Sequence, residues 1–277
     1  MSRPLSWRAE WVRQLGRRRT LWVFGILLVL PLIFVAAFSL DDGPPESRSG
    51  APIGSRMVDF ATTGSANFTV FALFVSGELL LFIVAALFAG DPVPAEASWS
   101  SLRYLLTAPV SRARLLTSKL VVGFASIALA LLVLPLWALL VGTLAYGSEP
   151  FSIPGGGELS WGQLLPRLGI ALLYLFVNLA PIAAIAFWVG VRTDTPLAAV
   201  GGALIVLIVS GILDSIDALG DWRKALPGHY SRAWLDLFAG SDIDWTTLRH
   251  GTLWAILYAV LFLALGYRRF RRKDILS

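Results

Sequence analysis

The stretch SKLVVGFASIALALLVLPLWALLVGTLA, residues 118–145, carries no charged side chain after Lys119. An α-helix needs roughly 20 apolar residues to cross the hydrocarbon core of a bilayer, and this run is longer than that. The bilayer core holds no water to bond a bare backbone, so a helix is the structure that such a run can adopt there. The stretch therefore predicts a membrane-spanning helix.

Five more stretches have the same character, at about 20–40, 66–90, 164–190, 196–216 and 251–267. The composition agrees, because 56% of the 277 residues are hydrophobic and the mean hydropathy of +0.71 exceeds that of soluble domains. The first stretch follows Arg17, Arg18 and Arg19 as in a signal peptide, but it is long enough to span and is interpreted as a retained helix. We predict an all-α membrane protein in which residues 1–277 form one domain with six transmembrane helices.

The basic residues indicate which side each connection faces, since short loops rich in Lys and Arg stay in the cytoplasm. Sixteen of the 23 Lys and Arg lie before the first predicted span, in the second and fourth connections with their flanks, or after the last span. We therefore expect a multi-pass protein of the cell inner (plasma) membrane with both termini cytoplasmic. The formal charge of +5 fits membrane lipids as partners along these flanks, and no nucleic-acid partner is expected.

The side chains that bind metals are scarce. The chain has no cysteine, and its two histidines, His229 and His250, lie in one hydrophilic segment. Disulfides, thiolate ligands and cysteine nucleophiles are thereby excluded, and no metal site is expected.

Residues 1–19 predict a helix that lies along the cytoplasmic surface of the membrane. Leu5, Trp11, Val12 and Leu15 fall near one helical face and most of the arginines fall elsewhere, as in interfacial helices. The alternative is that these arginines only set the topology.

Two external connections differ in character. Residues 41–65 combine Pro, Gly and Ser with acidic side chains and predict a loop. Residues 217–250 intersperse aromatic side chains such as Tyr230 and Trp234 with charges, and they predict short helices at the outer membrane surface between spans five and six.

The cytoplasmic connection, residues 91–117, is the most informative part of the chain. An extended Pro-rich start is followed by a predicted amphipathic helix from Ser100 to Thr107 and a break at Pro109. Leu102, Leu105 and Leu106 form an apolar patch on this helix. Arg103, Arg112 and Arg114 of the connection supply charge for an acidic or polar partner surface. A short rigid helix that is connected to two spans can transmit a movement of a cytoplasmic motor to both spans. The alternative is a solvated loop with a few topology-setting arginines.

This segment resembles the one that follows the second span of ABC-2 type permeases, the membrane-spanning subunits of bacterial ABC transporters. The shared pattern is Glu96, then SLRYLLTAPVSR at 101–112, then Lys119 at the start of span three, with Ser100 and Ser101 where that family usually has Gly-Thr. The likeness extends to the basic end GYRRFRRKDI at 266–275. It implies a type V exporter-like fold with a coupling helix. The ATPase-coupling residues that it implies are Glu96, Leu102, Arg103, Leu105, Leu106, Pro109 and Arg112.

The same resemblance implies a transport function with partners. Such permeases work with two copies of a separate ABC ATPase subunit and with a second copy of themselves or a homologous permease. The implied activity is export of a hydrophobic or amphipathic compound, such as a drug, antibiotic or lipid.

The chain itself has no G-x-x-x-x-G-K-[ST] motif. It is therefore not expected to be an enzyme or to hold a cofactor, and ATP and Mg belong to the partner. LSWGQ at 159–163 is one letter from an ABC signature, but Ser160 is interpreted as a helix cap and Trp161 as an interface anchor. Thr195 followed by Pro196 likewise marks the start of the fifth span.

A carboxylate lies near the middle of the second predicted span. Burying Glu78 in FVSGELLLF (74–82) costs about 2.5–3.5 kcal/mol on insertion scales, so it should face protein or water. Asn67, Phe71, Phe74 and Glu78 share one helical face and are candidates for a translocation path, as is Asn178 in the fourth span. The alternative for Glu78 and Asn178 is a hydrogen-bonded packing role between helices.

Two other functions stay open. A proton-coupled secondary transporter would use Glu78 as its carrier, although no inverted repeat is evident. A membrane-embedded enzyme would need a catalytic set, and no His, Cys or second acid accompanies Glu78 at that depth.

Overall fold

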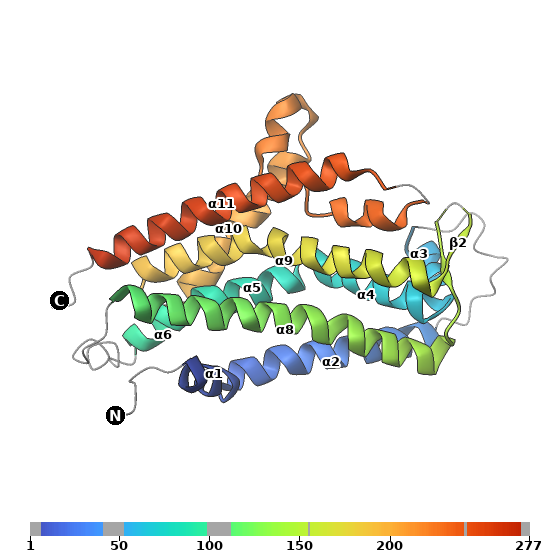
Figure 1. The fold of residues 1–277 in the computed structure, drawn as a ribbon, viewed down its shortest axis with the longest axis horizontal. Coiled ribbons are helices and arrows are strands. Elements are labelled where there is room, and N and C mark those ends of the chain that lie inside the picture. The colour runs from blue at the N-terminus through green and yellow to red at the C-terminus, as the bar shows by residue number, and fades with distance from the viewer. Residues whose placement is uncertain (1–6, 41–52, 99–111, 155, 241–242, 273–277) are drawn as a thin grey trace.

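The computed structural model describes residues 7–40, 53–98, 112–154, 156–240 and 243–272. Its long helices run side by side along one axis (Figure 1). The first helix and the end of the last helix lie at one end of this bundle, which we call the termini end. A short β-hairpin lies at the opposite end, which we call the hairpin end. The elements in chain order are α1 (Trp7–Leu15), α2 (Arg18–Ser39), α3 (Ile53–Thr62), α4 (Ser65–Glu78), α5 (Leu80–Gly90), α6 (Pro92–Ser98), α8 (Arg112–Tyr146), β1 (Phe151–Ser152), β2 (Glu158–Leu159), α9 (Trp161–Arg192), α10 (Pro196–Asp214), the 3₁₀ helices η2 (Asp217–Ala225) and η3 (Ala233–Phe238), and α11 (Trp245–Arg271).

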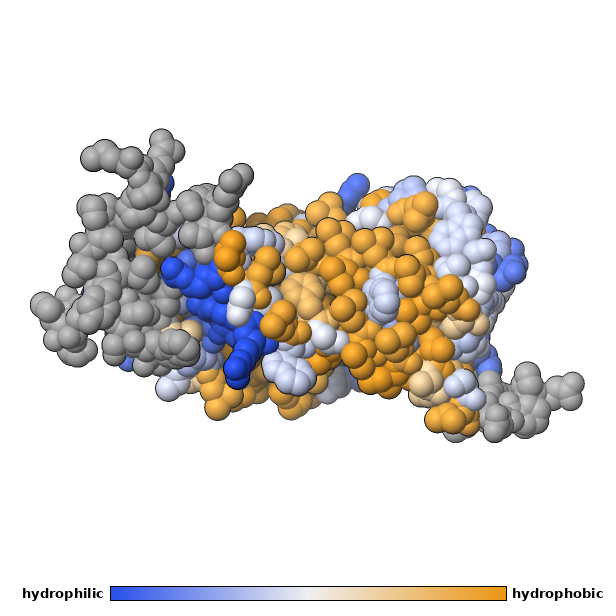
Figure 2. All heavy atoms as spheres, turned by 90° about the horizontal axis from the view of Figure 1, so that it is seen from below, coloured by the Kyte–Doolittle hydropathy of each residue, from blue (hydrophilic) through white to orange (hydrophobic). Residues whose placement is uncertain are grey.

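Among the described residues, five helices are long and apolar enough to cross a membrane, namely α2, α8, α9, α10 and α11. Their positions correspond to five of the six predicted spans. Many of their large apolar side chains point outward, as expected where lipid and not water surrounds a helix. The exposed apolar surface covers the middle of the molecule in Figure 2.

The predicted span at 66–90 is two helices. The axes of α4 and α5 meet at 57°, and Leu79 between them has non-helical dihedrals (φ −144°, ψ −45°). Their packing partners give the reason, because α4 packs mainly on α8 while α5 packs mainly on α9. The chain changes partner at Leu79, and the helix breaks there.

The predicted interfacial helix is shorter than residues 1–19. α1 ends at Leu15, and α2 begins at Arg18 after a short turn. The buried face of α1 is polar, since Glu10 and Gln14 are each 5% exposed, whereas Val12 is 69% exposed. Val12 and Leu15 of α1 therefore face outward.

The hairpin end contains more regular structure than predicted. The predicted loop at 41–65 includes α3, and the connection after α8 forms the two-stranded hairpin β1–β2, an exception to the all-α prediction. Gly156 and Gly157 have φ of 110° and 100°, which suits the tight turn between the strands. Phe151 of β1 is fully buried and meets the Phe60 ring edge-on at 5.7 Å, so α3 and the hairpin share a core.

The segment between α10 and α11 contains two short helices, η2 and η3, where short helices were predicted. η3 packs against α9 and α11 because its apolar side chains Trp234, Leu237 and Phe238 are buried, whereas η2 has no buried residue. The backbone of the segment is also held, since Tyr174 Oη of α9 donates to Tyr230 O at 2.7 Å and Gly228 N donates to Ser210 Oγ of α10 at 3.2 Å. In Figure 1 this segment rises from the side of the bundle beyond α11.

Two glycines set the closest approach of α5 and α9. A Cβ placed on Gly190 would lie 2.3 Å from the carbonyl oxygen of Gly90, so only glycine fits there. The surroundings of Gly201 and Gly202 in α10 are looser, since a Cβ on Gly201 would meet nothing within 4 Å and one on Gly202 would lie 3.4 Å from Val189 Cγ1. The α5–α9 crossing therefore lies near the termini end.

Candidate functional site

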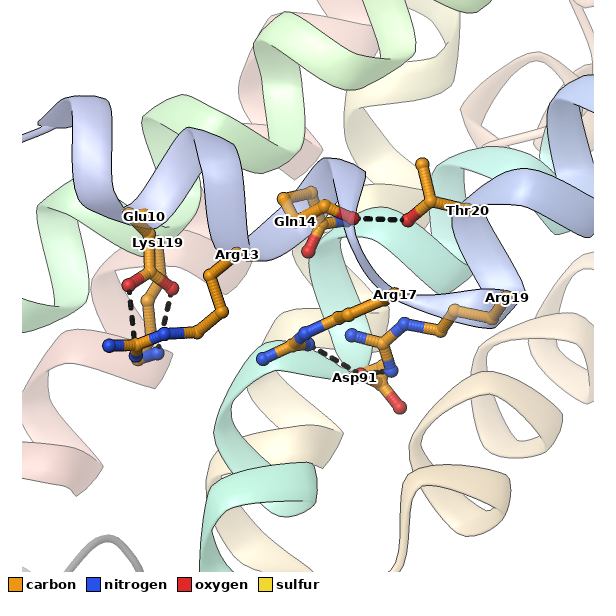
Figure 3. A network of polar contacts seen from close by, with 8 residues as sticks. All are labelled: Glu10, Arg13, Gln14, Arg17, Arg19, Thr20, Asp91 and Lys119. Atoms are coloured by element: carbon orange, nitrogen blue, oxygen red, sulfur yellow. Dashed lines mark hydrogen bonds and ion pairs between the residues drawn. The ribbon is translucent and has the colours of Figure 1, made fainter.

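Four basic side chains and two carboxylates meet at the termini end, in a group that we call the clasp (Figure 3). Its members are Glu10, Arg13, Gln14, Arg17, Arg19, Thr20, Asp91 and Lys119. They come from α1, the turn before α2, the start of α2, the α5–α6 junction and the start of α8. Because these elements are distant in sequence, the clasp is a tertiary joint between the N-terminal helices and the rest of the bundle.

Glu10 joins α1 to α8. Its Oε1 accepts a hydrogen bond from Lys119 Nζ at 3.0 Å, and its Oε2 accepts one from Arg13 Nη1 at 3.3 Å. Lys119 is 3% exposed, so the pair is shielded from water. A buried charge is tolerated only beside a counter-charge, and each of these two side chains therefore depends on the other.

Asp91 joins the start of α2 to the α5–α6 junction. It is 4% exposed, accepts a hydrogen bond from Arg17 Nη1 at 3.3 Å and also pairs with Arg19. Thr20 Oγ1 donates to Gln14 O at 2.7 Å and closes the turn between α1 and α2. This turn is thus fixed both within itself and onto α5 and α6.

An apolar cluster, which we call the termini-end cluster, is built on the same helices. Its buried members are Val93, Leu115, Leu116, Leu120, Phe187, Val191 and Phe270. They belong to α6, α8, α9 and α11. Tightly packed side chains transmit displacement instead of absorbing it, so a shift of α6 acts on three long helices.

The predicted coupling residues lie mostly outside the described residues. Leu102, Arg103, Leu105, Leu106 and Pro109 fall within 99–111, where nothing is described.

Two coupling residues border that gap. Glu96 lies in α6 and Arg112 is the first residue of α8, although their side chains are also outside the described part. The segment 99–111 therefore joins two helices that the termini-end cluster holds, and Asp91 and Lys119 of the clasp lie close to them in the chain.

Two of the predicted path residues have packing contacts. Asn67 is fully buried, with Nδ2 donating to Ser152 O at 3.0 Å and Oδ1 accepting from Ser152 N at 3.0 Å. Its amide therefore holds β1 against α4. Phe71 faces α2, where it meets the rings of Phe34 and Phe38 edge-on, each at 5.4 Å.

Phe74 lies near the break between α4 and α5. It lines a small cavity of about 20 Å³ with Gly77, Phe82 and Trp234, and the Arg232 guanidinium lies 6.0 Å from its ring centroid. Glu78 is the last residue of α4, directly before the break, and its side chain is outside the described part.

Asn178 lies in a separate cavity of about 10 Å³. Its walls include Phe82 of α5, Pro181 of α9 and Pro227 from the segment after η2. Phe74 and Asn178 thus occupy neighbouring positions around Phe82, whereas Asn67 and Phe71 do not line these cavities. A volume of this size holds about one water molecule.

A larger cavity, of about 420 Å³, lies at the hairpin end. The hairpin, Gln163, Arg167 and Gly240 line it, and none of the predicted path residues does. Arg167 Nη1 donates to Leu237 O at 2.8 Å and to Gly240 O at 2.6 Å, so this side chain ties α9 to the end of η3.

The sequence reasoning missed the clasp. Glu10 and Gln14 are four residues apart, which puts them on one face of a helix, and this spacing was a usable signal of a polar buried face. Asp91 directly follows an apolar run, and this position was also a usable signal of a charged residue at a helix end. Their partners were not visible, because Lys119 lies 109 residues from Glu10 and Asp91 lies 74 residues from Arg17.

Residues 58–276 match the family described as "Protein of unknown function (DUF2705)", a match over more than half of the chain. The chain belongs to this family. The DUF2705 match includes Asp91 and Lys119, whereas the other clasp residues, on α1, α2 and the turn between them, precede it. A similar protein is the "Uncharacterized protein YhcI" of Bacillus subtilis (strain 168), which is 25% identical over 230 residues, covering 77% of this chain and 67% of that protein. Neither description names an activity.

Proposed function

We propose that this DUF2705 protein is the permease subunit of an ATP-driven ABC transporter in the cell inner membrane. It exports a hydrophobic or amphipathic compound and works with a separate ATPase that binds ATP and Mg. The likeness of residues 96–119 to ABC-2 permeases supports this proposal. The observation that carries it is the shared core of α6, α8, α9 and α11, because the two helices that flank residues 99–111 belong to it.

The motor docks on residues 91–117, which face the cytoplasm with both termini. When ATP closes the two motor subunits, the flanking helices α6 and α8 tilt, and the termini-end cluster passes this tilt to α9 and α11. The clasp makes α1 and α2 follow, since Lys119 and Asp91 hold them.

The bent pair α4–α5 acts as the sixth span in this proposal. Two permease copies, identical or homologous, enclose the path between them. Because the cavities at Phe74 and Asn178 hold about one water each, cargo moves only when the helices around Phe82 separate.

Co-purification tests the proposal. The tagged chain is extracted from its own membranes in mild detergent, and bound proteins are identified by peptide mass spectrometry. A P-loop ATPase in about equal amount, with ATP hydrolysis in the purified complex, is the expected result. Arg103→Glu and Leu106→Glu should each abolish this hydrolysis while the chain stays folded.

Thr63→Glu is the matched control, because Thr63 is exposed and lies between α3 and α4, outside the predicted coupling segment 91–117. It should leave ATP hydrolysis unchanged. Unimpaired hydrolysis in both Arg103→Glu and Leu106→Glu removes the coupling role of this segment. A folded, homogeneous chain that transports without any ATPase removes the permease proposal.

The break at Leu79 favours one second candidate, a proton-coupled secondary transporter. Discontinuous helices commonly carry the coupling-ion site of such transporters, and Glu78 directly precedes the break. Transport that survives ATP depletion and stops when the proton gradient collapses would support this candidate. Loss of transport on ATP depletion with the gradient intact would exclude it.

A further inference from the structure

Arg19 has hydrogen-bond donors that no described residue satisfies. Its Nη1 faces Asp91, while Nε and Nη2 are buried and have no partner in the described part of the chain. The Nε–H and one N–H of Nη2 point in the same direction, and this edge of a guanidinium matches two oxygens of one phosphate or carboxylate. The Nε–Nη2 edge of Arg19 is therefore suited to bind an oxyanion.

Gln14 presents a further unsatisfied donor in the clasp. Its side chain is 5% exposed, and Nε2 has no partner among the described residues. Figure 3 shows Gln14 in the same group as Arg17 and Arg19. Buried donors without an acceptor are unfavourable, so an acceptor group is expected here.

The acceptor beside Arg19 is expected to be an anion, because a guanidinium stays positively charged. Among the described residues, Asp91 pairs with Arg19 and also with Arg17, and Glu10 pairs with Arg13 and Lys119. A phosphate would meet the remaining edge of Arg19 without displacing either carboxylate.

The surroundings place this anion in a membrane. Val12 before the turn is 69% exposed, and Leu21 and Trp22 after it are 64% and 73% exposed, so apolar side chains flank the arginines on both sides. Trp and Arg next to an apolar span are typical of the headgroup level of a bilayer. Figure 2 shows the same change on the surface, where a hydrophilic patch toward the termini end borders the hydrophobic middle.

We propose that the Nε–Nη2 edge of Arg19, together with the Gln14 amide, binds the phosphate of an anionic phospholipid at the turn between α1 and α2. A lipid fits better than free phosphate, because the acyl chains of the lipid cover the exposed apolar side chains beside the turn. The bound lipid completes the clasp and holds the turn against Asp91 and α6. This inference does not depend on the transport proposal.

Native mass spectrometry of the delipidated full chain tests the lipid site. The chain is titrated with phosphatidylglycerol and, separately, with phosphatidylcholine. Losing a charge-assisted, two-pronged contact typically weakens binding by about tenfold or more. The wild type should prefer phosphatidylglycerol by about tenfold, and Arg19→Gln should lose this preference.

Arg192→Gln is the matched control, since Arg192 is an exposed arginine at the same end and stacks on Trp188 at 3.8 Å. It should keep the preference. Gln14→Leu removes one donor without changing the charge and should weaken phosphatidylglycerol binding by a smaller factor. This second variant keeps the test valid if Arg19→Gln does not fold.

Three outcomes would overturn the proposal. Equal binding of the two lipids by the wild type means that the site does not select an anionic phospholipid. An unchanged preference in both Arg19→Gln and Gln14→Leu places the lipid elsewhere. Release of phosphatidylglycerol by inorganic phosphate at millimolar concentration makes the site one for the free ion.

Discussion

The two ends of the molecule are held by different chemistry. At the termini end, buried charges join distant helices, with Glu10 on Lys119 and Asp91 on Arg17 and Arg19. At the hairpin end, side chains bond to backbone groups instead, as Asn67 does with Ser152.

This difference bears on motion. Asp91 has two arginine partners, so it can release one of them and still be neutralised by the other. A backbone N–H or C=O that loses its side-chain partner has no such substitute and stays unsatisfied. The termini end is therefore the end that can rearrange, and the hairpin end is the fixed one.

The largest expected effect comes from the glycine crossing near the termini end. Gly190→Ala puts a Cβ 2.3 Å from Gly90 O, and since both groups belong to backbones, α5 and α9 must separate. We expect a loss of more than about 3 kcal/mol in the free energy of unfolding, at the upper end of overpacking costs. Thermal unfolding in detergent measures it.

Gly201→Ala is the control for this substitution, because its Cβ would meet nothing within 4 Å. Alanine is the better helix former by about 1 kcal/mol, so this variant should be as stable as the wild type or more stable. Equal melting temperatures for the two variants would show that α5 and α9 do not cross closely at Gly190.

The next effect tests the buried charges. Glu10→Gln leaves Lys119, which is 3% exposed, without its carboxylate. Breaking a buried pair in this way costs about 3 kcal/mol, which corresponds to a melting temperature roughly 6–12 °C lower. Glu158→Gln, at an exposed hairpin position, should change stability by less than about 0.5 kcal/mol.

A double variant separates the charge from the packing. Replacing both members by apolar residues, Glu10→Leu with Lys119→Met, removes the unpaired charge and should recover most of the loss. No recovery in the double variant would mean that the polar pair is required for the position of α1. Full stability of Glu10→Gln alone would mean that the pair does not hold α1.

A smaller effect is expected at the hairpin end. Asn67→Ala leaves the N–H and C=O of Ser152 without their side-chain partner. We expect about 2 kcal/mol of destabilisation, measured by thermal unfolding. Ser152→Ala keeps both bonds, since they involve only the Ser152 backbone, and it should be neutral. An Asn67→Ala variant as stable as Ser152→Ala would contradict the fixed character of this end.

The contrast also explains what the sequence could predict. A long apolar run predicts a membrane-spanning helix from the local sequence alone. Residues at the helix start are also local signals, as Thr195 and Pro196 are for α10 and Ser160 is for α9. The break at Leu79 has no such signal in its own residue type. It arises because α4 and α5 have different partners, which is a property of the packed bundle.

The candidate site shows the same limit. The resemblance to ABC-2 permeases predicts a coupling segment within residues 96–119. The helices that flank 99–111, α6 and α8, both contribute to the termini-end cluster. Asn67, Phe71 and Phe74 share one helical face, and their place in a translocation path stays a prediction, because a helical face does not reveal its neighbours. The structure gives these three side chains β1, α2 and Arg232 as neighbours.

The smallest expected change in stability concerns two carboxylates near the hairpin end, Asp236 and Asp244. Their pKa values shift in opposite directions. Burial, with a further contribution from the charge of Asp244, raises the pKa of Asp236 above its usual 3.8. A hydrogen bond from the backbone N–H of Thr246 lowers the pKa of Asp244 below 3.8. These opposite shifts predict opposite responses of stability to pH.

The raised pKa means that the folded state binds a proton at Asp236 more readily than the unfolded chain does. Ionised Asp236 therefore destabilises the fold at neutral pH, and the penalty disappears as the pH falls through the raised pKa toward 3.8. Asp236→Asn should raise stability at pH 7 by less than about 0.5 kcal/mol, since the group is partly solvated. This advantage over the wild type should vanish near pH 4.

Asp244→Ala is the opposite case. The contribution of Asp244 is fully present above pH 3.8 and is lost as the pH falls through its lowered pKa, so the variant should be less stable than the wild type at pH 7. The two differences from the wild type should have opposite signs at pH 7, and thermal unfolding at pH 7 and pH 4 checks them. If both differences had the same sign, solvent would reach Asp236 as freely as Asp244, and the packing of η3 onto α9 would be looser than the buried Trp234 and Leu237 indicate.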